Sequence, residues 1–141
     1  MKALRTTIAL CATSLLAIGV TACGATTVST SSFKGEQQQV AKAVAHLQSH
    51  ATALEAKKIC GEDLAAAAVA RLNASKGCKQ AIESQLKEID SFETTVQSVQ
   101  VNGATATARV KSIDAGKKTI QTVTFAKEGG KWRISGLGTG S

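Results

Sequence analysis

The spacing of the apolar residues changes near residue 91, and this change limits the folds that the chain can adopt. Between residues 36 and 90 the apolar residues recur at steps of three and four, as in Val40, Val44 and Leu47. Beyond residue 91 they alternate with polar residues, as in Ala108 and Val110. Steps of three and four predict amphipathic helices, whereas alternation predicts strands with one buried face. Helices packed on an antiparallel sheet define an α+β fold.

Three helices are expected in the first half of the chain. The first covers residues 36–58, which contain neither glycine nor proline. The second covers residues 60–73 and has Glu62 and Asp63 in its first turn, where the helix dipole favours acids. The third covers residues 75–90. Each of the last two helices is expected to carry one cysteine, in its first turn and on its apolar side.

Four strands are expected in the second half. They are predicted at residues 92–101, 104–112, 118–127 and 131–137. Asn102–Gly103 favours a two-residue hairpin loop between the first two strands, and the sequences DAGK and EGGK predict the next two turns. A change of phase in the first strand predicts a bulge near Gln97–Ser98. The expected architecture is three N-terminal helices packed on a four-stranded antiparallel meander.

The first 23 residues have the pattern of an export signal. The apolar run at residues 8–20 follows two basic residues and is too short to cross a membrane, which takes about 20 apolar residues. Val20–Thr21–Ala22–Cys23 resembles the lipobox of bacterial lipoproteins, in which the cysteine receives a diacylglyceryl group and the signal is cut just before it. The resemblance implies a signal peptide at residues 1–22 and a lipid anchor at Cys23, on the extracytoplasmic face of a bacterial membrane. An ordinary secretory signal is the alternative.

One small domain is expected after a tether. Residues 23–35 are rich in serine and threonine and lack an apolar period, which is typical of a flexible tether. Residues 36–141 have the length of a single domain. The formal net charge of +7 suits solubility or anionic surroundings. Nucleic acid is not an expected partner, because the basic residues are scattered and only three Phe and one Trp are available for stacking.

Cys60 and Cys78 are predicted to form a disulfide. They are the pair that remains once Cys23 is lipidated and Cys11 leaves with the signal. Export would place them in a compartment that permits disulfides. A structural zinc site is the alternative, but it needs four ligands, and no His or Cys stands nearby at ligand spacing. No metal is therefore expected.

The run VQSVQVNGATATARV at residues 96–110 and the ending TVTFAKEGGKWRISGL at residues 122–137 follow the predicted helices. Together they resemble the nuclear transport factor 2-like superfamily, and in particular its small lipoprotein members from bacteria. The resemblance implies a curved sheet that wraps around the long helix to form a cone, whose open end often holds a small apolar ligand. Some members are enzymes, whereas many others only bind, dimerise or scaffold, so a homodimer is left open.

No catalytic constellation is expected in the cone. Enzymes of this superfamily use a tyrosine with carboxylic acids, or a His–Asp partnership. This chain has no Tyr, and Asp114 falls in a predicted turn. His46 and His50 lie one helical turn apart but lack the acid support of an HExxH motif. Catalytic residues and a cofactor are therefore not expected.

Three residues are candidates for lining the cone cavity: His50, which borders the apolar stripe of its helix, and Phe125 and Trp132, which face inward. Core packing is the alternative for the two aromatic residues. The sequence predicts a lipid-anchored, non-catalytic binding or scaffolding domain, whose partner is a small apolar molecule or a protein. An enzyme or carrier acting on a small apolar ligand, with His50 as the base, is one alternative. A wall-associated protein that uses its basic face is another.

Overall fold

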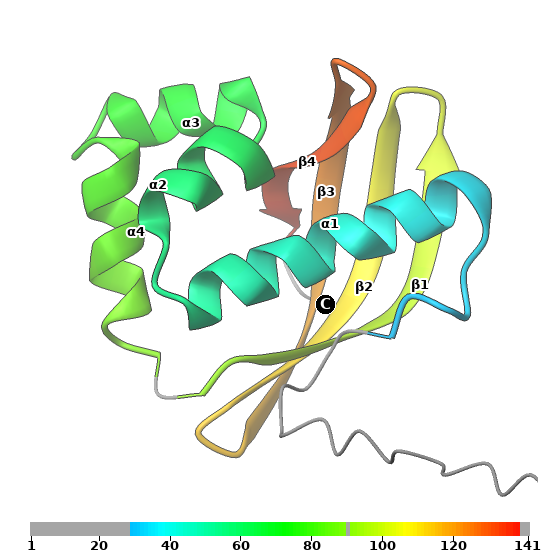
Figure 1. Cartoon of the computed structure of the whole chain (residues 1–141), viewed down its shortest axis with the longest axis horizontal. Coiled ribbons are helices and arrows are strands. Elements are labelled where there is room, and N and C mark those ends of the chain that lie inside the picture. The colour runs from blue at the N-terminus through cyan, green and yellow to red at the C-terminus, as the bar shows by residue number, and fades with distance from the viewer. Residues whose placement is uncertain (1–28, 90, 139–141) are drawn as a thin grey trace, which may run out of the picture.

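The computed structural model describes residues 29–89 and 91–138, which form helices followed by one antiparallel sheet. The helical segments are α1 (Gly35–Thr52), α2 (Ala56–Lys58), the π-helical turn η1 (Ile59–Asp63), α3 (Ala66–Asn73) and α4 (Cys78–Leu86). The strands are β1 (Glu93–Asn102), β2 (Thr105–Asp114), β3 (Lys117–Glu128) and β4 (Lys131–Gly138). Helix α1 crosses one face of the curved sheet, and α2, α3 and α4 are grouped beside β4 (Figure 1). The α+β prediction is confirmed.

The first helix is shorter than predicted. It ends at Thr52 rather than near residue 58, although no glycine or proline interrupts the segment. Leu54 adopts a positive φ of 57°, and the chain turns back into the short helix α2. This turn buries Ala56 and Ile59 against Ala51, so tertiary burial outweighs the local preference for a continuous helix.

The second predicted helix is also interrupted, because the chain pairs with β4. Leu64 is extended and forms a parallel bridge with Ile134, and the Ala65 N–H donates to the Ile134 carbonyl at 2.8 Å. Helix α3 therefore begins only at Ala66. Asp63 lies in η1 instead of in the first turn of a long helix.

The sheet has the predicted meander order β1-β2-β3-β4 with all neighbours antiparallel. The predicted bulge is confirmed by a register shift between Val96 and Ser98. The first hairpin loop is one residue later than predicted, because Asn102 pairs with Thr105. Gly103, at φ 59°, then supplies the positive φ that the first position of a type II′ loop requires.

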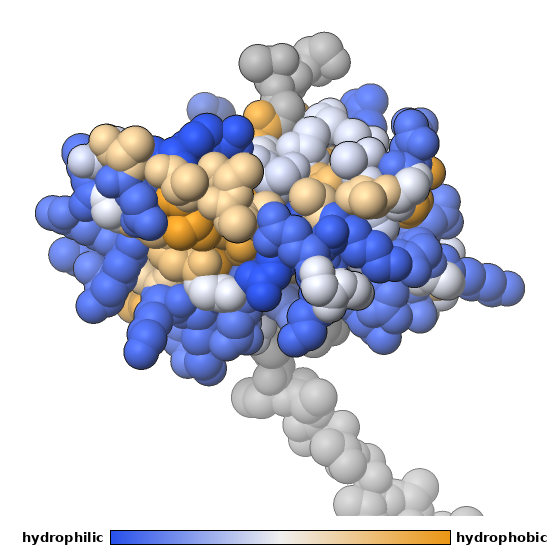
Figure 2. Space-filling view, turned by 90° about the horizontal axis from the view of Figure 1, so that it is seen from above, coloured by the Kyte–Doolittle hydropathy of each residue, from blue (hydrophilic) through white to orange (hydrophobic). Residues whose placement is uncertain are grey.

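The core consists of two clusters of buried side chains. The larger cluster lies between α1 and the sheet, where Val40 and Ala41 are fully buried. The smaller cluster joins the end of α1 to α2, η1 and α4 through Ala51, Ile59 and Leu86. The helical half also exposes apolar surface, since Ala66, Ala67 and Ala70 of α3 are exposed, and Figure 2 shows apolar residues gathered over this half among hydrophilic neighbours.

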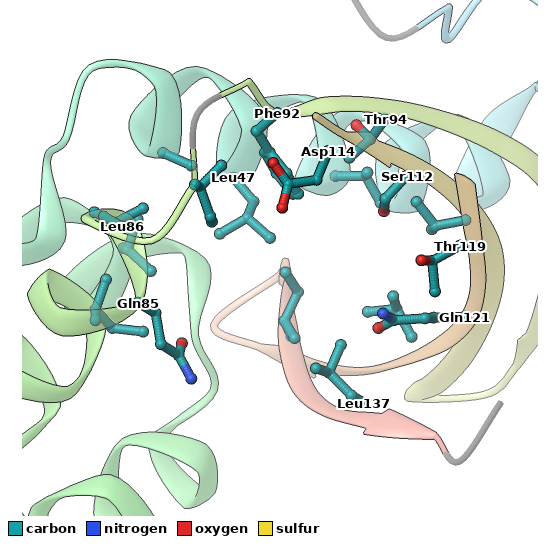
Figure 3. Close-up of a pocket in the computed structure, with 18 of the residues that line it drawn as sticks. Leu47, Gln85, Leu86, Phe92, Thr94, Ser112, Asp114, Thr119, Gln121 and Leu137 are labelled. Carbon is teal, nitrogen blue, oxygen red and sulfur yellow. The ribbon is translucent and has the colours of Figure 1, made fainter. Parts of the chain in front are cut away.

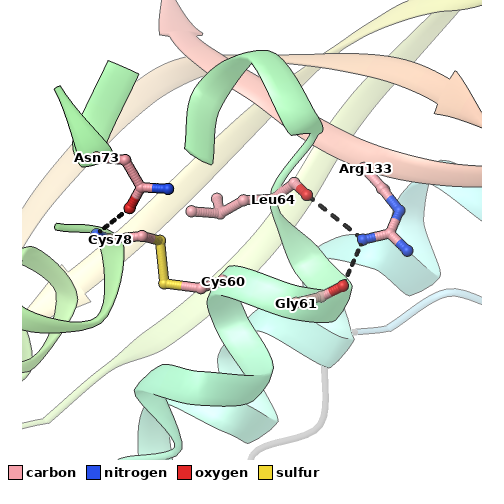
Figure 4. The surroundings of a disulfide bond; sticks show 6 residues. All are labelled: Cys60, Gly61, Leu64, Asn73, Cys78 and Arg133. Carbon is pink, nitrogen blue, oxygen red and sulfur yellow. Dashed lines mark hydrogen bonds between the residues drawn. A yellow bond between two sulfur atoms is a disulfide. The ribbon is translucent and has the colours of Figure 1, made fainter. Parts of the chain in front are cut away.

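The predicted disulfide between Cys60 and Cys78 is present, with the two Cα atoms 6.1 Å apart. It links η1 to the first residue of α4 (Figure 4). Cys60 therefore lies in the π-helical turn rather than at the start of a helix as predicted. Asn73 accepts from the Cys78 N–H at 2.8 Å, and Arg133 donates to the Gly61 carbonyl at 2.7 Å. These bonds tie both ends of the disulfide to neighbouring elements.

The predicted signal peptide, Cys23 and residues 23–28 of the tether lie outside the described residues. In the described part of the chain, no helix is long and apolar enough to cross a membrane.

Candidate ligand-binding cavity

A cavity of about 370 Å³ lies between the two core clusters, bounded by the helices on one side and the sheet on the other (Figure 3). Its volume falls within the range of about 300–1,000 Å³ that is common for small-molecule sites. Its apolar lining residues are Val44, Leu47, Ala51, Ile59, Ile82, Leu86, Ile89, Phe92, Val110, Val123, Ile134 and Leu137. Its polar lining residues are Gln85, Thr94, Ser112, Asp114, Lys117, Thr119 and Gln121.

The helical wall of the cavity is almost entirely apolar. Leu47 and Ala51 project from the apolar stripe of α1, and Ile82 and Leu86 project from the corresponding stripe of α4. The stripes follow the steps of three and four that predict amphipathic helices. At Ile82 and Leu86, α4 packs toward the other helices and not against the sheet. The cavity therefore lies between α4 and the β2–β3 hairpin (Figure 3).

The sheet wall changes from apolar to polar along the β2–β3 hairpin. Toward the β3–β4 turn, the paired residues Ala106 and Phe125 are both buried. Toward the β2–β3 turn, the cavity is lined instead by the pair Ser112 and Thr119. The sequence analysis did not single out these polar residues. The alternation of β3 could have found them, because the same phase that places Val123 and Phe125 inward also places Thr119 and Gln121 inward.

The two aromatic candidates belong to the core and do not line the cavity. Phe125 is only 1% exposed and packs in the cluster beneath α1. The Trp132 ring is buried, and its Nε1–H donates to Glu36 Oε2 at 2.6 Å. Lys127 also donates to the Glu36 carboxylate, and hydrogen bonds from Lys127 and then Trp132 lower the pKa of Glu36. Both aromatic residues therefore pack in the core, which was the alternative given for them.

His50 does not line the cavity either, although its neighbours Leu47 and Ala51 do. Its Nδ1 lies 2.7 Å from Oδ2 of Asp63, a pairing that the sequence analysis did not anticipate. Asp63 was expected in the first turn of a long helix, whereas the π-helical turn directs it against α1, where only 4% of the residue is exposed. Burial raises the pKa of Asp63, and the hydrogen bond with His50 opposes this rise. The pair joins α1 to η1 behind the cavity wall.

Comparisons with known proteins define the fold. No protein-family model and no curated protein matches the chain. Among solved structures, the chain is similar to a variant of the designed protein Rd1NTF2_05, with a TM-score of 0.50 and 17% identity over 73% of this chain and 97% of that one. A de novo designed protein with a curved β-sheet matches with a TM-score of 0.37 and 20% identity, over 43% of this chain and 57% of that one. The first of these two likenesses supports a nuclear transport factor 2-like cone, as expected.

Proposed function

We propose that this protein is a lipid-anchored, extracytoplasmic binding module that holds a small apolar ligand in its cone cavity and performs no catalysis. The observation that carries the proposal is the open cavity of about 370 Å³ with its apolar helical wall. Transfer of apolar surface from water into such a site stabilises a complex by roughly 25 cal/mol for each Å² buried. A ligand of this kind is poorly soluble in water and partitions into membranes. A carrier tethered to a membrane would therefore lie close to its ligand.

The membrane anchor is inferred from the sequence. The quartet Val20–Thr21–Ala22–Cys23 ends an apolar run of signal-peptide length, and a stretch rich in serine and threonine follows it. A diacylglyceryl group would supply two acyl chains, and stable membrane attachment generally takes two such signals. The domain would then sit at the outer face of the membrane on a short tether.

A binding role is favoured over an enzymatic one by the chemistry of the lining residues. Asp114 and Lys117 are the two titratable groups among them, and both are exposed to solvent at the β2–β3 turn. General acid–base catalysis needs a titratable group within hydrogen-bond reach of the reacting atom. The alternative with His50 as the base is not supported, because His50 lies behind the cavity wall and is bonded to Asp63.

We predict that Ile82→Lys weakens binding of the neutral apolar dye Nile red at least tenfold. Ile82 lines the cavity from α4, and an ammonium group there would have to be desolvated or drawn away to admit the dye. The matched control is Gln80→Lys, because Gln80 is exposed on the same helix and does not line the cavity. Fluorescence titration gives both affinities, and circular dichroism melting checks both folds. Equal dye affinities for the two variants would contradict a ligand site in the cavity.

We predict that Cys23→Ala abolishes lipid attachment and moves the protein from the membrane fraction to the soluble or medium fraction. The thiol of Cys23 is the group that the lipobox resemblance marks for diacylglyceryl transfer. Cell fractionation and the intact mass of the chain measure the two effects, and Cys11→Ala, inside the apolar run, is the control. Unchanged membrane retention of Cys23→Ala would refute the anchor.

A further inference from the structure

The part of the cavity nearest the β2–β3 turn is lined by successive cross-strand pairs of increasing polarity. Val110 pairs with Gln121, then Ser112 with Thr119, and then Asp114 with Lys117 at the turn itself. All of these residues line the cavity, and Ser112, Thr119 and Gln121 point into it in Figure 3. We call Ser112, Thr119 and Gln121 the polar strip. It faces the apolar wall formed by α1 and α4.

The polar strip has hydrogen-bonding capacity that no other described residue takes up. Within residues 29–89 and 91–138, the side chains of the polar strip form no hydrogen bond. Thr94, which also lines the cavity, differs in this respect, because its backbone N–H and its hydroxyl both donate to Oε1 of Gln48. The hydroxyl groups of Ser112 and Thr119 and the amide of Gln121 can each donate and accept. A ligand that fills the cavity takes the place of water at these groups.

A purely apolar ligand would therefore bind at a cost. Covering a polar group without replacing its hydrogen bond weakens binding, because the group loses its bond to water. A ligand with hydroxyl or amide groups along one edge avoids this cost, while its apolar body still covers Leu47, Ile82 and Leu86. Charge gives a second constraint, because Asp114 and Lys117 cancel each other among the lining residues. A ligand with a net charge would meet one attractive and one repulsive partner at the turn.

We propose that the ligand is a single-chain amphiphile of no net charge, whose hydroxyl or amide groups bond the polar strip while its acyl chain lies against α1 and α4. This inference rests on the proposed binding function and names the class of ligand for the same cavity. It also gives the pair Asp114 and Lys117 a role in selecting neutral over ionised amphiphiles.

The test uses three probes that share one alkyl length: monolauroylglycerol, laurate and dodecane. Each is titrated as a competitor of Nile red, below its aggregation concentration, against the wild-type protein and two double variants. Thr119→Val/Gln121→Leu removes most of the polar strip, at positions that are exposed or half-buried and therefore tolerant. Gln100→Leu/Thr122→Val makes the same kinds of change at positions that do not line the cavity.

The strip variant should bind monolauroylglycerol about tenfold more weakly than wild type, a change of about 1.4 kcal/mol, because two hydrogen bonds to the ligand are lost. Its affinity for dodecane should be higher, because the polar groups that dodecane would cover are gone, and the control variant should behave as wild type. The inference would be overturned if the strip variant bound monolauroylglycerol as tightly as wild type does. It would also be overturned if wild type bound laurate tenfold more tightly than monolauroylglycerol. In either case, binding of Nile red and dodecane would leave the proposed function standing. Failure of wild type to bind any of these molecules would overturn both.

Discussion

Replacing Phe125 with alanine should lower the free energy of unfolding by about 3–5 kcal/mol, the usual cost of deleting a buried aromatic ring. Phe125 is 1% exposed and packs among the buried side chains between α1 and the sheet. The truncation removes apolar contacts and leaves a void that the neighbouring strands cannot fill by collapsing. Urea denaturation followed by circular dichroism measures the change.

The matched control for this core variant is Ile120→Ala on the same strand. Ile120 is 43% exposed, so its truncation should cost no more than about 1 kcal/mol. A loss of less than 1 kcal/mol for Phe125→Ala would mean that the ring is not a core residue. The prediction from the sequence that Phe125 lines the cavity would then be favoured again.

The double variant Cys60→Ser/Cys78→Ser should lose about 3 kcal/mol of stability, as the chain-entropy model gives for a closed loop of roughly 15 residues. The bond joins η1 to α4, and the ring that it closes has a sequence separation of 18. For a domain whose total stability is expected at about 5–15 kcal/mol, this is a large share. The disulfide also holds together two elements that line the cavity through Ile59 and Ile82.

Reductant provides the control for the disulfide variant. Wild-type protein should lose a similar amount of stability when it is reduced, whereas the double variant should melt at the same temperature with and without reductant. Thermal denaturation under both conditions measures this. An unchanged melting temperature for reduced wild type would show that the bond contributes nothing to the fold.

The strands could be predicted from the sequence because their signals are local. Alternation fixes which residues of β2 face inward, and the positive φ that glycine readily supplies fixes turns such as Gly129–Gly130. The register follows from these two constraints except between β3 and β4, where it shifts between Thr124 and Phe125. The first hairpin loop was misplaced by one residue because Asn102 and Gly103 both favour turn positions, and pairing of Asn102 with Thr105 decides between them.

The helix ends could not be predicted, because contacts distant in sequence determine them. The break after Asp63 depends on Ile134, which accepts from the Ala65 N–H and bridges Leu64. The pairing of His50 with Asp63 likewise joins α1 to η1, two elements whose contact the local sequence does not specify. The cavity exists because α4 lies at a distance from the sheet, and the spacing of apolar residues along the sequence does not predict that distance.

Both edges of the sheet have carbonyl groups that are already bonded. On β4, the carbonyls of Ile134 and Ser135 accept from Ala65 N–H and from the Arg71 guanidinium. On β1, the side-chain amide of Gln37 donates to the Val99 carbonyl at 3.0 Å.

An incoming strand from another chain would have to displace these donors before it could extend the sheet. The bulge in β1 would also disrupt the register of hydrogen bonds between β1 and an incoming strand. The molecule is thereby protected against edge-to-edge polymerisation, a hazard that grows when many copies are crowded together on one surface.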